Sequence, residues 1–279
     1  MTTPSRLRVT LGGTLVILLV VFATLGPLVS SHDPYVSEFG RALAADETPV
    51  GPGAAFWFGA DRLFRDVFTR LAVGGRLSLA IAVAATAVAT TTGTIVGLVA
   101  GTFEGKAADH ALMRLVDVGL AFPFLLVVMA VGAAVDRTSA TTILLTLGFT
   151  GWLGTARIVR AKTLGIRRKE FVAASRALGQ SELRIVVLHV LPNLGGALVV
   201  LATTQVAQMI LAESVLGWLG AGIAPPVPTW GAMLAEGQDQ IQAAPWLVVA
   251  PASALVAAVL GFTLLGEGLR DALDPPTAR

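Results

Sequence analysis

The sequence predicts an all-α polytopic membrane protein with six transmembrane helices, and three observations support this fold class. Hydrophobic residues make up 54% of the 279 residues, charged residues make up 14%, and the mean hydropathy is +0.76, values too apolar for a soluble domain of this length. Nearly uncharged runs recur with the length of about 20 residues that a helix needs to cross a bilayer. Lysine and arginine gather in alternate connecting segments.

The six predicted transmembrane helices are separated by connections of very different lengths. Pro123 lies within the third span, where we expect a kink, and a short turn over 136–139 leads to the fourth. Small residues are abundant, above all over 84–97, which favours close packing between helices. In chain order the predicted spans are residues 11–29, 77–100, 115–135, 140–158, 194–216 and 246–266.

The positions of the basic residues predict that both chain ends lie in the cytoplasm. With residues 1–10 and 268–279 inside, the cytoplasmic segments hold fourteen lysines and arginines and the opposite side holds six. Basic residues close to spans are retained on the cytoplasmic side, so this orientation is favoured. The first run follows Arg6 and Arg8 as a signal peptide would, but no small-residue cleavage pattern ends it, and we interpret it as a lasting span.

Two predicted extracytoplasmic segments are longer than simple turns. Residues 30–76 begin with polar sequence rich in proline and glycine, and they end in Arg-Asp-Val-Phe-Thr-Arg-Leu at 65–71, which predicts an amphipathic helix at the outer surface. Residues 218–245 contain Pro-Pro-Val-Pro-Thr-Trp-Gly at 225–231, where proline stops a helix. Residues 77–267 then form a five-helix core that includes this second outer loop.

The cytoplasmic segment 157–192 is longer than a connection between spans needs to be, which suggests a function. Good helix formers cover 169–178, Gly179 stands where a left-handed C-cap is favoured, and Ser181 is placed to cap a second helix over 182–190. The segment therefore predicts a helix, a turn and a helix. Its first helix carries a face of small residues that another protein could approach closely: Ala173, Ala174 and Ala177.

The segment also carries a sequence pattern. Glu-Phe-Val-Ala-Ala-Ser-Arg-Ala-Leu-Gly at 170–179 is followed by His-Val-Leu-Pro-Asn at 189–193. This layout resembles the cytoplasmic loop of the permease subunits of binding-protein-dependent ABC importers. Ala173 stands where the core glutamate of that loop usually lies, Ser175 replaces its second core alanine, and Glu170 matches an upstream glutamate of the peptide branch.

Further blocks extend the resemblance over about residues 56–275, to the C-type permease of dipeptide, oligopeptide and nickel importers. Phe64 departs from the pattern, because the family usually has glycine at that position. The blocks that carry the resemblance, in order, are Phe-Gly-Ala-Asp at 58–61, Gly-Arg-Leu-Ser-Leu at 75–79, Ala-Phe-Pro at 121–123 and the proline-rich sequence at 225–234.

The resemblance implies a type I ABC importer permease fold in the bacterial inner membrane and a channel-forming subunit that translocates short peptides. The implied partners are a homologous second permease subunit, two ATPase subunits, an extracytoplasmic binding protein and membrane lipid. No cofactor is expected on this chain, because ATP and Mg would bind the ATPase subunits. The residues expected to couple to the ATPases are Glu170, Ala173, Ala174, Ser175, Arg176 and Gly179.

Glu213 is the candidate for lining the transport pathway. It lies near the outer end of the fifth predicted span, where a carboxylate needs a partner, a cavity or water. Hydrogen bonding between helices is an equally good interpretation of the same position.

Other classes of function lack the residues that they need. Residues 104–107 lack the first glycine and the hydroxyl residue of a phosphate loop, and the sequence has no cysteine, no metal-ligand spacing and no nucleophile with its base. We therefore expect neither an enzyme, nor a metal site, nor nucleic-acid binding. A nickel importer of the same family, a secondary transporter and a structural subunit stay open, although the last two explain the long cytoplasmic segment poorly.

Overall fold

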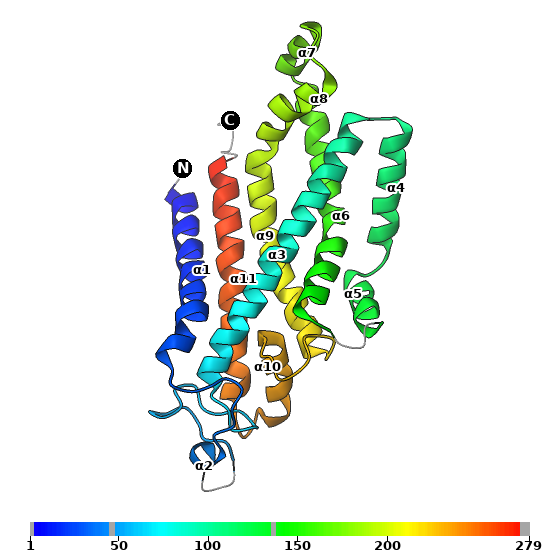
Figure 1. The fold of residues 1–279 in the computed structure, drawn as a ribbon. Coiled ribbons are helices and arrows are strands. Elements are labelled where there is room, and N and C mark those ends of the chain that lie inside the picture. Colours follow the sequence, from blue (N-terminus) through cyan, green and yellow to red (C-terminus); the bar gives the residue numbers. More distant parts are fainter. Residues whose placement is uncertain (1–2, 45–47, 135–137, 274–279) are drawn as a thin grey trace.

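The computed structural model describes residues 3–44, 48–134 and 138–273. Long helices lie side by side; α7 (Glu170–Ala177) projects beyond them at one end, and α2 (Phe39–Ala42) and α10 (Trp230–Gly237) lie toward the other (Figure 1). Among the described helices, five are long and apolar enough to cross a membrane, or six if one bent pair counts as a broken span. The all-α, polytopic prediction is confirmed.

The start of α1 and the end of α11 lie toward the same end of the molecule as α7 (Figure 1). This placement agrees with the expectation that both chain ends lie on one side of the membrane. The remaining helices are α1 (Thr3–Val29), α3 (Val67–Thr102), α4 (Ala107–Ala121), α5 (Phe124–Ala133), α6 (Ala140–Arg167), α8 (Glu182–Ile185), the π-helix η1 (Val186–Val190), α9 (Leu191–Trp218), η2 (Gln238–Gln240) and α11 (Trp246–Leu273).

Glycines spaced four residues apart bring α3 and α6 into close contact. Gly93, Gly97 and Gly101 lie on one side of α3, and a Cβ added to Gly97 would lie 2.6 Å from the carbonyl oxygen of Ala156. A Cβ on Gly101 would lie 2.7 Å from the Cβ of Thr163. Only glycine allows backbones to approach this closely, as in membrane helix pairs generally. The close packing predicted from the small residues is confirmed.

The amphipathic surface helix predicted at 65–71 is wrong. Asp66 instead caps α3, since its carboxylate accepts a hydrogen bond from the N–H of Thr69 at 2.8 Å, and α3 runs from Val67 without a break. The side chain of Arg70 in the first turn is buried. The arginines that suggested a surface helix are neutralised by ion pairs with other side chains. The helix therefore begins at Val67, ten residues before the predicted apolar span at 77.

The third span is broken, not merely kinked. The axes of α4 and α5 differ by 84°, and Phe122 between them is extended, as expected for a residue that precedes proline. Pro123 follows it and has no N–H to continue the helix. Residues 135–137 lie outside the described residues, and Ser139 caps α6 by accepting a hydrogen bond from the N–H of Thr142.

The cytoplasmic segment predicted at 157–192 belongs largely to helices. α6 continues to Arg167, and α8, η1 and α9 form one helix of 37 residues from Glu182 to Trp218. Pro192 does not interrupt that helix, because the wider π turn over Val186–Val190 precedes it and makes room where proline cannot donate a hydrogen bond. Only residues 168–181 connect the two long helices.

Candidate functional site

The turn after α7 is fixed by hydrogen bonds within its own backbone. Gly179 has a φ of 80°, a conformation that glycine adopts without steric cost. Its N–H donates to the carbonyl of Arg176 at 3.0 Å, and the N–H of Gln180 donates to that of Ser175 at 3.2 Å, the bond pair of a Schellman C-cap. Ser181 then caps the next helix, so the predicted helix, turn and helix are confirmed.

The predicted coupling residues of α7 and its turn divide between two faces. Leu178, beside them, is 83% exposed. Ser175 points the other way: its hydroxyl donates to the carbonyl of Phe171 at 2.8 Å and lies 3.3 Å from Nε2 of His189 on the long helix. Ser175 therefore holds α7 against the long helix and lies off the exposed face. The predicted coupling residues that are exposed are Glu170, Ala173, Ala174, Arg176 and Gly179.

Arg176 is already bound within the chain. Its Nε donates to Oε1 of Glu182 at 2.7 Å, and this hydrogen bond raises the pKa of Arg176. The charged form of the arginine is therefore favoured by its contact with Glu182. Its bond joins the end of α7 to the start of the next helix.

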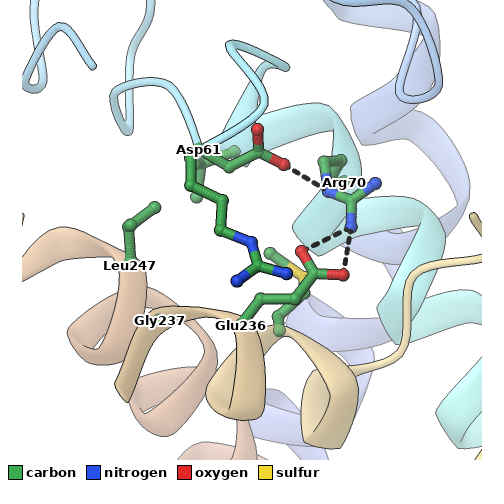
Figure 2. Close-up of a pocket in the computed structure, with 8 residues that line it drawn as sticks. Asp61, Arg70, Glu236, Gly237 and Leu247 are labelled. Carbon is green, nitrogen blue, oxygen red and sulfur yellow. Dashed lines mark hydrogen bonds and ion pairs between the residues drawn. The ribbon is translucent and has the colours of Figure 1, made fainter. Parts of the chain in front are cut away.

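Four charged side chains at the opposite end of the molecule form a closed cluster that we call the outer ion cluster: Asp61, Arg65, Arg70 and Glu236. Asp61 Oδ2 lies 2.7 Å from Nε of Arg65 and 3.1 Å from Nε of Arg70, and Glu236 Oε2 lies 3.1 and 3.0 Å from the terminal nitrogens of the same two arginines. Figure 2 shows Arg70 between the two carboxylates. Each arginine forms ion pairs with both acids, so the cluster joins α10 to the start of α3.

Glu213 is fully buried between α9, α3 and α10. The hydroxyls of Ser78, Ser214 and Thr229 lie beside its carboxylate, although none reaches hydrogen-bond geometry. Ser78 Oγ accepts a hydrogen bond from the N–H of Trp230, and Thr229 Oγ1 accepts one from the N–H of Ala232. Neither of these bonds uses the hydroxyl hydrogen. Glu213 is therefore closed off from any open pathway in this conformation, and lining the pathway and bonding between helices both stay predictions for it.

Comparison with known proteins identifies the family. Residues 93–279 match the family of the binding-protein-dependent transport system inner membrane component. The chain belongs to this family. It is 40% identical, over 81% of its length and 73% of the relative's, to the dipeptide transport system permease protein DppC of Alkalihalophilus pseudofirmus. It is 38% identical, over 93% and 84%, to the oligopeptide transport system permease protein OppC of Escherichia coli.

A solved structure supports the fold of this permease. An inward-facing methionine ABC transporter, MetNI, contains a chain that superposes with a TM-score of 0.58 at 22% identity, over 73% of the permease and 95% of that chain. The likeness confirms the predicted ABC transporter permease fold. As a member of this family, the permease is a multi-pass component of the inner membrane that works with a binding protein.

A hollow of about 460 Å³ lies between the broken span, α4 and α5, and the helices α6 and α9. Most of its lining is apolar, and Gln205 within it is bonded internally, since its Nε2 donates to the carbonyl of Gly151 at 2.9 Å and its Oε1 accepts from Thr155. Gln208 also lines it, is exposed and makes no hydrogen bond within the described residues. An exposed amide on a span disfavours direct contact with lipid.

Sequence reasoning missed Glu236 and Glu182. Glu236 sits in the outer loop, 166 positions from Arg70, and no spacing rule connects residues so far apart. A usable signal was the pair of arginines on a segment expected outside, where positive charges are few. Glu182 was placed in the predicted helix, and its position as first residue was a signal for a capping or pairing role.

Proposed function

We propose that this permease is the channel-forming subunit of an ATP-driven importer that carries short peptides across the bacterial inner membrane. The observation that carries the proposal is the identity of 35–40%, over 81–95% of the chain, to permease proteins of dipeptide and oligopeptide transport systems. A homologous second permease subunit, two ATPase subunits that hold ATP and Mg, and an extracytoplasmic binding protein complete the transporter.

The exposed face of α7 meets an ATPase subunit in this proposal. α7 projects beyond the membrane-crossing helices (Figure 1), and its small residues allow another backbone to come close. The chain ends lie on the same side, which is the cytoplasm, and residues 30–66 and 218–245 lie outside. Residues 1–10 and 268–279 are the cytoplasmic termini, and residues 77–267 hold the five-helix core with its coupling segment.

The hollow between α5, α6 and α9 faces the second permease subunit and the peptide pathway. Its apolar walls suit a neighbouring helix, and the free amide of Gln208 suits a hydrogen bond to a polar group inside the assembly. ATP-driven closure of the ATPases rocks the two permeases between inward-facing and outward-facing states, because α7 moves with the ATPase that it contacts.

Uptake by cells tests the substrate. Cells that lack this chain are compared with complemented cells for energy-dependent uptake of labelled di- and oligopeptides and, separately, of nickel ions. We expect peptide uptake to be lost and restored. Loss of nickel uptake alone would show that the chain belongs to a nickel importer. No change in either uptake would refute both a peptide importer and a nickel importer.

Cross-linking tests the docking face. The chain has no cysteine, so Ala174→Cys places a single thiol on the exposed face and Thr163→Cys places one on a buried face of α6. We expect the first, and not the second, to cross-link to an ATPase subunit in isolated membranes.

A further inference from the structure

Glu182 bonds to both helices that precede it in the chain. Its Oε1 accepts from Nε of Arg176, at the end of α7, at 2.7 Å, and its Oε2 accepts from a terminal nitrogen of Arg167, at the end of α6, at 2.7 Å. Three helix ends therefore meet at one carboxylate. Two charge-assisted hydrogen bonds to one acceptor fix its neighbours more firmly than an isolated surface pair.

The position of Glu182 in its own helix allows a movement at this junction to be passed along the helix. It is the first residue of the uninterrupted helix from Glu182 to Trp218, where a carboxylate also favours the helix dipole. A second tie lies on the other side of α7, where the hydroxyl of Ser175 and the amide of Gln180 both contact His189 of the same helix. α7 is thus fastened to the long helix on two sides.

At its far end, the long helix packs so closely against the outer helix α10 that no side chain fits between the two backbones at two glycines. A Cβ added to Gly217 would lie 2.9 Å from the backbone nitrogen of Ala232, and one added to Gly231 would lie 2.2 Å from the carbonyl oxygen of Ser214. A displacement of Glu182 along or across the helix therefore moves α10 as well, because closely packed backbones transmit strain.

We propose that Glu182 is a positioning residue that fastens the coupling helix α7 to both flanking spans, so that a movement of α7 is passed through the long helix to α10. The role rests on the proposed function, since it assumes that an ATPase moves α7. Without the carboxylate, α7 keeps its contacts with His189 and its buried Val172 but loses the tie that Glu182 makes to Arg176 and Arg167. Its position then varies more, and part of its movement is lost before it reaches the spans.

Distances between spin labels test the fastening without any partner. Cysteines at exposed Lys162 on α6 and Leu178 after α7 carry the labels in the purified permease, whose sequence contains no other cysteine. We expect one narrow distance distribution for the unaltered background and a broader one with Glu182→Ala. Glu104→Ala is the matched control, since it removes an exposed carboxylate that pairs with Arg168 at 3.0 Å and leaves the distribution narrow.

Peptide transported per ATP hydrolysed tests the consequence. In proteoliposomes with the complete transporter and its binding protein, we expect Glu182→Ala to lower this ratio by about fivefold, the factor that corresponds to about 1 kcal/mol of lost pairing. Glu182→Gln keeps one acceptor oxygen, so we expect it to lower the ratio of peptide transported to ATP hydrolysed by less.

The outcomes separate the two proposals. An unchanged distance distribution and an unchanged ratio in Glu182→Ala would overturn the role of Glu182 while peptide uptake by the unaltered complex upheld the transport function. If the unaltered complex moved no peptide, the transport function would fail, and the label distances alone would decide whether Glu182 holds α7.

Discussion

The two ends of the molecule hold charged side chains in opposite ways. In the outer ion cluster the side chain of Arg70 is 1% exposed, and each arginine forms ion pairs with both acids of the set. At the α7 end, Glu182 and Arg176 bond at 2.7 Å but are 47% and 41% exposed. The chemistry is the same at both ends, and the burial differs.

Burial decides what each set of charges can do. Breaking a buried set leaves a charge without a partner and without water, which is costly, so the outer ion cluster keeps α10 and the start of α3 in one arrangement. An exposed pair is broken at lower cost than a buried one, because water can solvate the separated charges. The small-residue face of α7 lies beside the exposed pair, which makes the α7 end suited to meet a partner that binds and moves.

The largest loss of stability is expected from Arg70→Met in the outer ion cluster. This change leaves the buried Asp61 and the partly exposed Glu236 with Arg65 as their one remaining arginine partner in the cluster, and removal of one member of a largely buried set costs about 3 kcal/mol or more. Thermal unfolding of the purified permease measures it. The control is Arg41→Met, which removes a 68% exposed guanidinium that pairs with Glu38 at 3.3 Å and should lower stability by less than about 1 kcal/mol. Equal losses would contradict the comparison between the two ends.

A smaller loss of stability is expected from Gly231→Ala at the α10 end. The added methyl group would meet the backbone of Ser214, with its Cβ 2.2 Å from the carbonyl oxygen, and overpacking of this kind costs about 1–3 kcal/mol. Gly195→Ala is the matched control on α9, because nothing lies within 4 Å of its added Cβ. Alanine is also the better helix former, so the control should be neutral or slightly stabilising in the same unfolding experiment.

Gly179→Val tests the α7 end with a glycine that has open space around it. No atom lies within 4 Å of an added Cβ, so the cost is the left-handed backbone alone, about 1–2 kcal/mol, and the spans stay inserted. We expect the turn to change and ATP hydrolysis to continue with less peptide transported. Gly179→Asn should keep both activities, because asparagine tolerates this backbone. Normal transport by Gly179→Val would show that the turn need not be rigid.

The span prediction worked where the membrane dictates the sequence and failed where helices leave it. Apolar runs of the right length predicted five crossings among the described helices, whereas the third run is broken at Pro123. Gly179 and Ser181 predicted the turn because their roles depend on local backbone geometry. α6 runs nine residues past its predicted end. The prediction missed these residues because they include charges such as Arg160 and Arg167, and hydropathy detects only the apolar part of a helix.

The candidate site was predictable only in part, for a related physical reason. The exposed face of α7 follows from residue size at helical spacing. The outer ion cluster and the contacts of Glu182 join residues from different helices, and Glu213 proved buried because α10 folds back over it. Such contacts depend on which segments meet in space, and a single sequence does not contain that information in its spacing.

The smallest effect is expected from pH at the α10 end, through His32 in the outer segment. Burial alone lowers the pKa of His32, but hydrogen bonds to Glu38 at 2.5 Å and to the carbonyl of Ala55 at 2.9 Å, together with the charges of Glu38 and Asp66, outweigh it and raise the pKa above 6.5. The protonated form is thus favoured in the folded state.

This contribution to stability is complete below the unfolded pKa of 6.5 and is lost as the pH rises through the higher folded pKa. We therefore expect hydrogen exchange in residues 30–66 to be slower at about pH 5.5 than at about pH 8, after correction for intrinsic exchange, and His32→Gln to remove the difference. The α7 end should show no such dependence on His32. Equal protection of residues 30–66 at both pH values would show that the ring is not charged where it meets Glu38, and the α10 end would then hold its shape through the outer ion cluster without help from His32.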